Sequence, residues 1–242
     1  MKRIAFVAVK GGAGRTTTAV HAGHGLALAG HRVALVDADP RNGVAAWFGI
    51  EPGPGLAELL QGVPARGIEV RHGLVLIGSG GVSLSTLDAD LAAGRRPAPD
   101  LDPLFAALAD RDIVLFDGAA GCTVVQGLIL RACATWMVPF AADVLGLAAL
   151  RSAMEELRSV RTEATVIELL PTFHDPGDLF EATLVVALAT EFADLGAACH
   201  IRPSNVLRAA PAHRGTVFET HPHSDAALDH VRLVELLRRR AA

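Results

Sequence analysis

A short glycine-rich stretch, Lys10-Gly11-Gly12-Ala13-Gly14-Arg15-Thr16, separates two apolar segments near the start of the sequence. Residues 4–9 before it are apolar and partly β-branched, as in a buried strand, and the pattern of residues 17–29 after it has helical periodicity. Small residues allow successive backbone N–H groups to turn toward an anion at the beginning of a helix. The sequence therefore predicts a strand, a phosphate-binding loop and a helix. A tight turn without a ligand is the alternative.

The alternation of apolar strand and helix continues along the chain. We expect strands over residues 4–9, 32–36, 74–77, 112–116, 136–140 and 164–170. We expect helices over residues 17–29, 56–61, 84–93, 123–132, 145–160, 180–195 and 225–240. Such alternation is typical of a parallel sheet covered on both faces. The predicted fold is α/β, a doubly wound, mostly parallel sheet with helices on both faces, formed by residues 1–242 as a single domain.

Polar side chains accompany the loop and the ends of two predicted strands. Asp37 and Asp39 close the second strand, and Asp117 follows residues 112–116. In a phosphate loop, the hydroxyl of Thr16 is offered to Mg²⁺, and the side chain of Arg15 should reach the terminal phosphates. The alternative for Asp37 and Asp39 is a solvated turn in which Asp39 caps a helix.

The loop and the residues that follow it, Lys10 to Thr18, resemble the deviant Walker A loop of the ParA/MinD family of P-loop ATPases. Further segments are similar to motifs of that family, and the last two favour its ParA branch: residues 33–40, 112–117, 137–139, 145–147, 171–173 and 205–218. The resemblance implies the P-loop NTPase fold, ATP or ADP as ligand, and Mg²⁺ as cofactor.

The resemblance also implies a role for each polar residue. The early lysine, Lys10, would reach the nucleotide of a partner subunit and so act with Asp39 and Asp37 in catalysis. Asp39 would orient the attacking water, and Asp37 would hold the switch loop or the metal through water. The implied metal set is Thr16, Asp37 and Asp117. The residues implied to bind the nucleotide are Gly11, Gly12, Ala13, Gly14, Arg15, Thr16, Thr17, Pro171 and Pro211.

Two positions and one segment depart from the usual motifs. Val9 stands where the general P-loop has glycine, and Arg15 where it has lysine. Residues 118–121, Gly-Ala-Ala-Gly, follow Asp117 where the family commonly has a threonine and two prolines, so we expect a more flexible switch. Because the guanidinium of Arg15 is broad and planar, it either contacts phosphates bidentately with slow turnover or bars the nucleotide from the site.

Three functions remain open from the sequence. The first is a ParA-like, ATP-dependent dimerisation switch that positions a plasmid, chromosome, carboxysome or other large complex through nucleotide-gated, non-specific DNA binding. Its implied partners are a second copy of the chain, DNA, and a ParB-like or cargo-adaptor activating protein. The second is an adaptor with impaired nucleotide binding or hydrolysis that works through protein partners. The third is a small-molecule enzyme on the same fold, such as an ATP-dependent ligase or a reductase.

Composition limits the location and partners of the protein. The start of the sequence lacks a long apolar signal region, and the three cysteines, Cys122, Cys133 and Cys199, are widely spaced, so we expect the cytoplasm, with nucleoid association in the ATP-bound state. The net charge of -4 argues against a globally basic nucleic-acid binder. Arg232 and residues 238–240 are candidates for DNA backbone contact or for closing a helix. A membrane-binding tail over residues 231–237 is the weaker alternative, since a docked helix needs the same apolar face.

Overall fold

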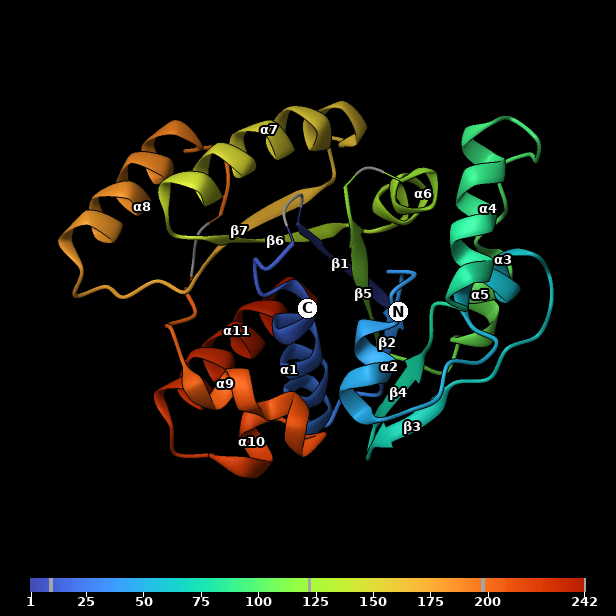
Figure 1. Cartoon of the computed structure of the whole chain (residues 1–242), viewed down its shortest axis with the longest axis horizontal. Helices are drawn as coiled ribbons and strands as arrows, with labels where there is room; N and C mark the ends of the chain where they lie inside the picture. Colours follow the sequence, from blue (N-terminus) through green and yellow to red (C-terminus); the bar gives the residue numbers. More distant parts are fainter. Residues whose placement is uncertain (9–10, 122, 197–198, 242) are drawn as a thin grey trace.

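The computed structural model describes residues 1–8, 11–121, 123–196 and 199–241 of the chain. Its strands form one seven-stranded sheet in the order β3-β4-β2-β5-β1-β6-β7 (Figure 1). The strands are β1 (Lys2–Ala8), β2 (Val33–Asp37), β3 (Ile68–Arg71), β4 (Leu74–Ile77), β5 (Ile113–Ala120), β6 (Thr135–Ala141) and β7 (Val166–Thr172). Neighbouring strands are parallel except β3 and β4, which confirms the predicted α/β class and the mostly parallel sheet.

Helices cover both faces of this sheet (Figure 1). One face carries α3 (Leu56–Leu60), α4 (Val82–Ala92), α5 (Asp102–Ala107), α6 (Val124–Ala132), α7 (Val144–Val160) and α8 (Leu179–Glu191). The other carries α1 (Arg15–Leu28), α2 (Gly43–Phe48), α9 (Asn205–Ala209), the 3₁₀ helix η1 (Ala210–His213), α10 (Val217–Thr220) and α11 (Asp225–Ala241). Within the described ranges, no helix has both the length and the apolar character needed to cross a bilayer.

The central strands are apolar over most of their length because each of them is buried on both sides. Along β1, Ile4 and Phe6 pack against α1 and α11, whereas Ala5 and Val7 belong to the core under α3 to α8. Successive side chains of a strand point to opposite faces, so a strand between two helical layers has no solvent-exposed face to make polar. This burial explains why the strand pattern could be recognised in the sequence.

Several short elements were not predicted. β3 is an antiparallel edge strand, and its partly exposed residues show no buried run. α2 has only six residues and lies between Asn42 and Gly49, both in the left-handed region. α5, also of six residues, begins at Asp102, in a stretch for which no helix was predicted. Elements of four to six residues contain few positions to show a period, so local pattern revealed only those with a continuous apolar run, α3 and β4.

A group of buried histidines joins the C-terminal helix α11 to α1. The rings of His21 in α1 and His230 in α11 lie 4.5 Å apart between centroids, and both side chains are fully buried. The Nδ1–H group of His21 donates to the carbonyl of Thr17, and its Nε2 accepts the backbone N–H of Val217. His21 is therefore held as a neutral imidazole, with one nitrogen donating and the other accepting.

The helix α2 is also tied to the C-terminal segment. The indole N–H group of Trp47 donates to the carbonyl oxygen of Gly215 over 2.9 Å. The edge of the Trp47 ring meets the ring of His21, with the centroids 5.6 Å apart. This helix, which directly follows the segment of Asp37 and Asp39, thus contacts both α1 and the segment before α10.

Candidate functional site

The glycine loop joins β1 to α1 with two glycines in the left-handed region. Gly12 has a φ of 86°, and Gly14, which caps α1, has a φ of 76°. Residues with a Cβ rarely adopt these angles, so both positions favour glycine. The first N–H groups of any α-helix lack partners within the helix, so this loop provides donors suited to an anion.

A cavity of about 360 Å³ lies over the loop. Its lining joins the loop to the segment after β2, and consists of Gly11, Gly12, Ala13, Gly14, Arg15, Thr16, Thr17, Asp39, Arg41 and Gly43. The structure thus gathers the glycine-loop residues around one cavity with Asp39. Lys10, for which the sequence implied contact with a partner subunit, lies outside the described residues, as does Val9.

Thr16 and Asp117 lie in direct contact below this cavity. The hydroxyl of Thr16 donates to Oδ2 of Asp117 over 2.7 Å. Because the hydroxyl donates its proton there, the lone pairs of Thr16 Oγ1 remain for a cation, and hard oxygen ligands are those that Mg²⁺ prefers. Burial raises the pKa of Asp117, against the charge of Arg15 and the hydrogen bonds of Thr16 and Arg15. The two residues therefore fit a magnesium ion, with Thr16 as a ligand and Asp117 behind it.

The guanidinium of Arg15 lies between the carboxylates of Asp39 and Asp117. Its Nε donates to Oδ1 of Asp117 and its Nη2 to Oδ2 of Asp39, each over 2.9 Å. Only 9% of the Arg15 side chain is exposed. An arginine has five N–H donors, so these two bonds leave three for other acceptors. Arg15 can therefore hold both carboxylates and still offer donors to a phosphate.

Asp37 holds the loop that follows β2. Its Oδ1 accepts the backbone N–H of Asp39 over 3.0 Å, and its Oδ2 accepts that of Val44, in the first turn of α2, over 2.9 Å. Burial raises the pKa of Asp37 to about 7, and the charge of Asp117 adds to the rise. Of the two roles implied by the sequence, the geometry favours holding the switch loop, because both carboxylate oxygens already accept backbone hydrogen bonds.

Asp39 is clamped between two arginines. Arg41 donates to it through Nε and Nη2, over 3.0 Å and 2.8 Å, and through its backbone N–H over 3.0 Å. Burial alone would raise the pKa of Asp39, but the hydrogen bonds of Arg41 and the charges of Arg15 and Arg41 outweigh it and hold the pKa below its ordinary value. Asp39 is thus a carboxylate at neutral pH.

Arg41 itself was missed in the sequence. The available signal was its place two residues after Asp39, where a side chain can fold back onto an Asx turn. Its ion pair with Asp39 depends on the conformation of the whole segment, which Pro40 and the bonds to Asp37 fix. The residue therefore adds a second arginine to the lining of the cavity.

The end of β7 touches the glycine loop. The hydroxyl of Thr172 lies 3.0 Å from the carbonyl oxygen of Ala13 and 2.9 Å from that of Phe140, so its proton is shared between two acceptors. Pro171, implied by the resemblance, is buried in β7 next to it. Pro211 is exposed in η1, and it does not line the cavity over the loop.

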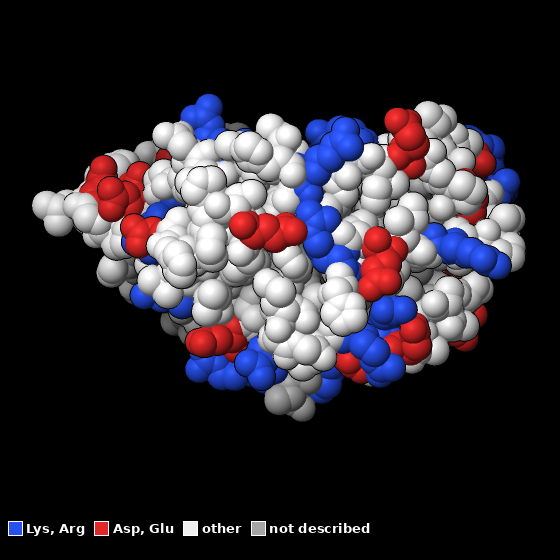
Figure 2. All heavy atoms as spheres, turned by 90° about the horizontal axis from the view of Figure 1, so that it is seen from below, with Lys and Arg blue, Asp and Glu red and all other residues white. Residues whose placement is uncertain are grey.

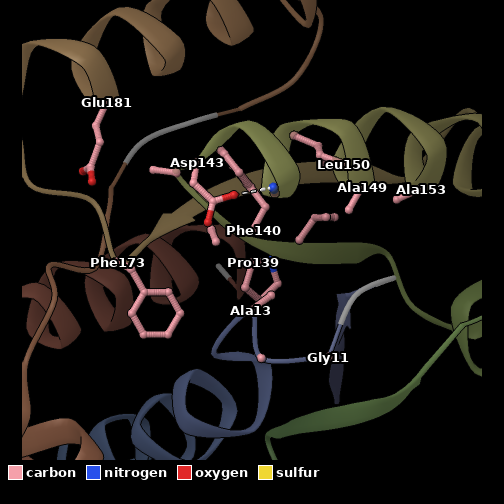
Figure 3. A pocket seen from close by; sticks show the side chains of 15 residues that line it. Gly11, Ala13, Pro139, Phe140, Asp143, Ala149, Leu150, Ala153, Phe173 and Glu181 are labelled. Atoms are coloured by element: carbon pink, nitrogen blue, oxygen red, sulfur yellow. Dashed lines mark hydrogen bonds between the residues drawn. The ribbon is translucent and has the colours of Figure 1, made fainter.

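A second cavity, of about 410 Å³, lies beside the same loop (Figure 3). The glycine loop, the end of β6, the first turns of α7 and Phe173 line it, and its walls are mostly apolar. Figure 3 shows Asp143 at the beginning of α7, where its carboxylate accepts the backbone N–H of Gly146 over 2.6 Å. The loop thus forms a wall of two cavities, and the start of α7 closes the second.

Comparison with known proteins finds relatives of this chain among partitioning ATPases. A family model described as an AAA domain matches residues 1–169. The chain is 30% identical over 243 aligned residues to a protein described as chromosome-partitioning ATPase Soj from Thermus thermophilus, covering 97% of this chain and 94% of the relative.

Solved structures agree with the fold. Apo McdA from Cyanothece superposes with a TM-score of 0.82 at 21% identity, covering 98% of each chain. A plasmid partition protein from Borrelia burgdorferi, bound to AMPPNP, superposes with a TM-score of 0.79 at 19% identity, covering 99% of each chain. At such identities the similarity of these structures concerns the fold.

Proposed function

Because this chain belongs to the ParA/MinD family of P-loop ATPases, we propose that it is an ATP-operated dimerisation switch that positions a large cellular cargo. ATP closes two copies of the chain on each other, the dimer binds DNA without sequence preference, and an activating partner stimulates hydrolysis to release it. The cargo is a plasmid, a chromosome or another large complex. The cycle takes place in the cytoplasm.

One observation carries this proposal: Thr16 and Asp39 line one cavity with the glycine loop, and the buried Asp117 accepts the hydroxyl of Thr16 below it. The loop binds the phosphates of ATP or ADP through backbone N–H groups. Thr16 and Asp117 hold Mg²⁺, which neutralises charge on the β and γ oxygens when it is bound. Asp39, a carboxylate at neutral pH, orients the attacking water.

Dimerisation rests on Lys10. If this lysine binds the nucleotide of the other subunit, Lys10→Ala should weaken the AMPPNP-dependent dimer about tenfold, the effect of losing one charge-assisted contact. Analytical ultracentrifugation with and without AMPPNP measures the shift. Lys2, the only other lysine of the sequence, lies exposed in β1 and provides the control variant, Lys2→Ala. An unchanged dimer in Lys10→Ala contradicts the switch.

DNA contact is proposed for the end of α11. Arg240 pairs with the buried carboxylate of Glu168, and Arg232 lies 3.7 Å from Asp229, so these two arginines already have structural partners. For Arg238 and Arg239, the described part of the chain gives no ion pair. Figure 2 shows basic and acidic side chains interspersed on one face of the molecule. Such a mixed surface favours weak, salt-sensitive contact with DNA.

An adaptor without nucleotide turnover is the second candidate, because Arg15 is bound to both Asp39 and Asp117. Arg15→Lys distinguishes the two functions. A lysine has no fork to bridge two carboxylates, so it should turn to the phosphates and raise ATP hydrolysis about tenfold, on the scale of one charge-assisted hydrogen bond. Phosphate release measures the change.

The matched control is Arg32→Lys, since Arg32 forms an exposed pair with Asp112 and should leave hydrolysis unchanged. If Arg15→Lys has the same turnover and ATP affinity as the parent, Arg15 does not limit the site. If the parent binds no ATP and Arg15→Lys does, the adaptor is supported.

A further inference from the structure

Among the described residues that line the cavity, only Arg41 combines a positive charge with high exposure. Of its side chain 69% is exposed, against 9% for Arg15 and 8% for Asp39. Among the described residues, its guanidinium donates hydrogen bonds only to Asp39. Its backbone N–H donates to the same carboxylate. Arg41 is therefore held at the entrance of the cavity by a single carboxylate.

The two arginines on Asp39 are not equally free to leave it. If the Arg41 side chain moves away, Oδ2 of Asp39 keeps the guanidinium of Arg15, and Oδ1 keeps the backbone N–H of Arg41. If Arg15 moves away, the fully buried Asp117 loses its only cationic partner within the described residues. An unpaired buried charge is costly, whereas an exposed ion pair contributes little. Arg41 is thus the arginine that can exchange partners.

The partner that would compete with Asp39 is a terminal phosphate. A phosphate group offers several acceptor oxygens and more negative charge than one carboxylate, and the arginine fork matches it bidentately. In the proposed function, Asp39 lies beside the terminal phosphate of ATP, where it orients the water. A guanidinium bound to Asp39 is then within reach of that phosphate, whereas a diphosphate offers no such group and leaves the guanidinium on Asp39.

We propose that Arg41 is a γ-phosphate sensor: a triphosphate in the loop takes its guanidinium from Asp39, and a diphosphate does not. This inference rests on the proposed function, since it assumes that the loop binds a nucleotide. Arg41 thereby makes the site prefer ATP over ADP, and it releases one side of Asp39 for the attacking water only when the γ-phosphate is present.

Isothermal titration with AMPPNP and with ADP, both in the presence of Mg²⁺, tests the sensor. Arg41→Gln should weaken AMPPNP about tenfold and ADP less than about twofold, because only the triphosphate gains the charge-assisted contact. Arg41→Lys keeps the charge and loses the fork, so it should fall between the parent and Arg41→Gln. Arg151→Gln, which removes an exposed arginine from the carboxylate of Glu191 far from the loop in sequence, should change neither affinity.

Equal weakening of both nucleotides, or of neither, overturns the sensor while the proposed function stands. If the parent protein binds neither AMPPNP nor ADP, the proposed function fails, and the sensor fails with it. Thermal unfolding of each variant checks that it folds. Should Arg41→Gln fail to fold, Arg41→Lys decides: a selective loss of AMPPNP affinity supports the sensor, and unchanged affinities overturn it.

Discussion

Replacing Gly146 by alanine should lower the free energy of unfolding by about 3 kcal/mol, which is roughly a hundredfold in the folding equilibrium. A Cβ at this position would lie 2.0 Å from the carbonyl oxygen of Ala141, and backbone atoms cannot yield as a flexible side chain can. Gly146 lies in the first turn of α7, whose start Asp143 caps. The added methyl group must therefore push α7 away from the end of β6.

Gly127→Ala is the matched control for that experiment. Gly127 also lies inside a helix, α6, but a Cβ there would meet nothing closer than the end of the Arg131 side chain, at 3.7 Å. Without a clash, alanine in a helix should stabilise the protein by up to about 1 kcal/mol. Urea unfolding of both variants measures the difference. Equal stabilities of the two variants would show that α7 has room to move.

Acidification should destabilise the contact between α1 and α11. Burial lowers the pKa of His230 to about 4, and it lowers the pKa of His21 well below the ordinary value, with the charge of His230 adding to the effect. An unfolded histidine binds its proton near pH 6.5, whereas these two stay neutral when folded. Their contribution to stability is therefore complete above pH 6.5 and is lost as the pH falls below it.

The expected loss is about 1.4 kcal/mol per histidine at pH 5.5, or about 3 kcal/mol for the pair. The surrounding groups include His24 on α1, Glu219 on α10, Arg71 on β3 and Asp229 on α11. Asp37 acts in the opposite direction: its pKa is raised to about 7, so the folded state takes up a proton there as the pH falls. The histidine contribution must therefore be read from a difference between variants.

His230→Leu supplies that difference. Within the described residues the Nε2 of His230 has no hydrogen-bond partner, and its Nδ1–H group donates only to the carbonyl oxygen of Ala226, one turn earlier in α11, so an apolar replacement removes a single local hydrogen bond. Between pH 7.5 and pH 5.5, the parent should lose about 1.4 kcal/mol more than His230→Leu does. His72→Leu, at a fully exposed histidine, should follow the parent. Parallel curves for the parent and His230→Leu would mean that His230 titrates normally.

The sequence contained enough to predict the glycine loop and the sheet, because both depend on local pattern. The positive φ angles at positions 12 and 14 favour glycine, and strands buried on both faces are mostly apolar. Asp37 ends β2 as predicted and Asp39 follows it, whereas Asp117, expected to follow a strand that ends at residue 116, lies inside β5, which continues to Ala120. These features belong to single segments or to the most regular part of the fold.

The contacts between segments could not be predicted in the same way. The hydroxyl of Thr172 meets the loop at Ala13 only because β7 and β1 both flank β6 in the sheet. The double ion pair of Arg15 depends on two carboxylates from different segments, the loop after β2 and strand β5, 24 and 102 residues away. Neither arrangement has a local period or a composition signal, and side-chain direction decides both.

The short helix α2 is held by a hydrogen bond at each of its two ends. At its start, the N–H of Val44 is bound to Asp37, and near its end the indole of Trp47 is bound to the carbonyl of Gly215. Because α2 has only six residues, the two hydrogen bonds are joined by a short, rigid helix. A displacement of the segment around Asp39 is therefore transmitted through α2 to Gly215. The C-terminal third of the chain thus responds to what the carboxylates of the site bind.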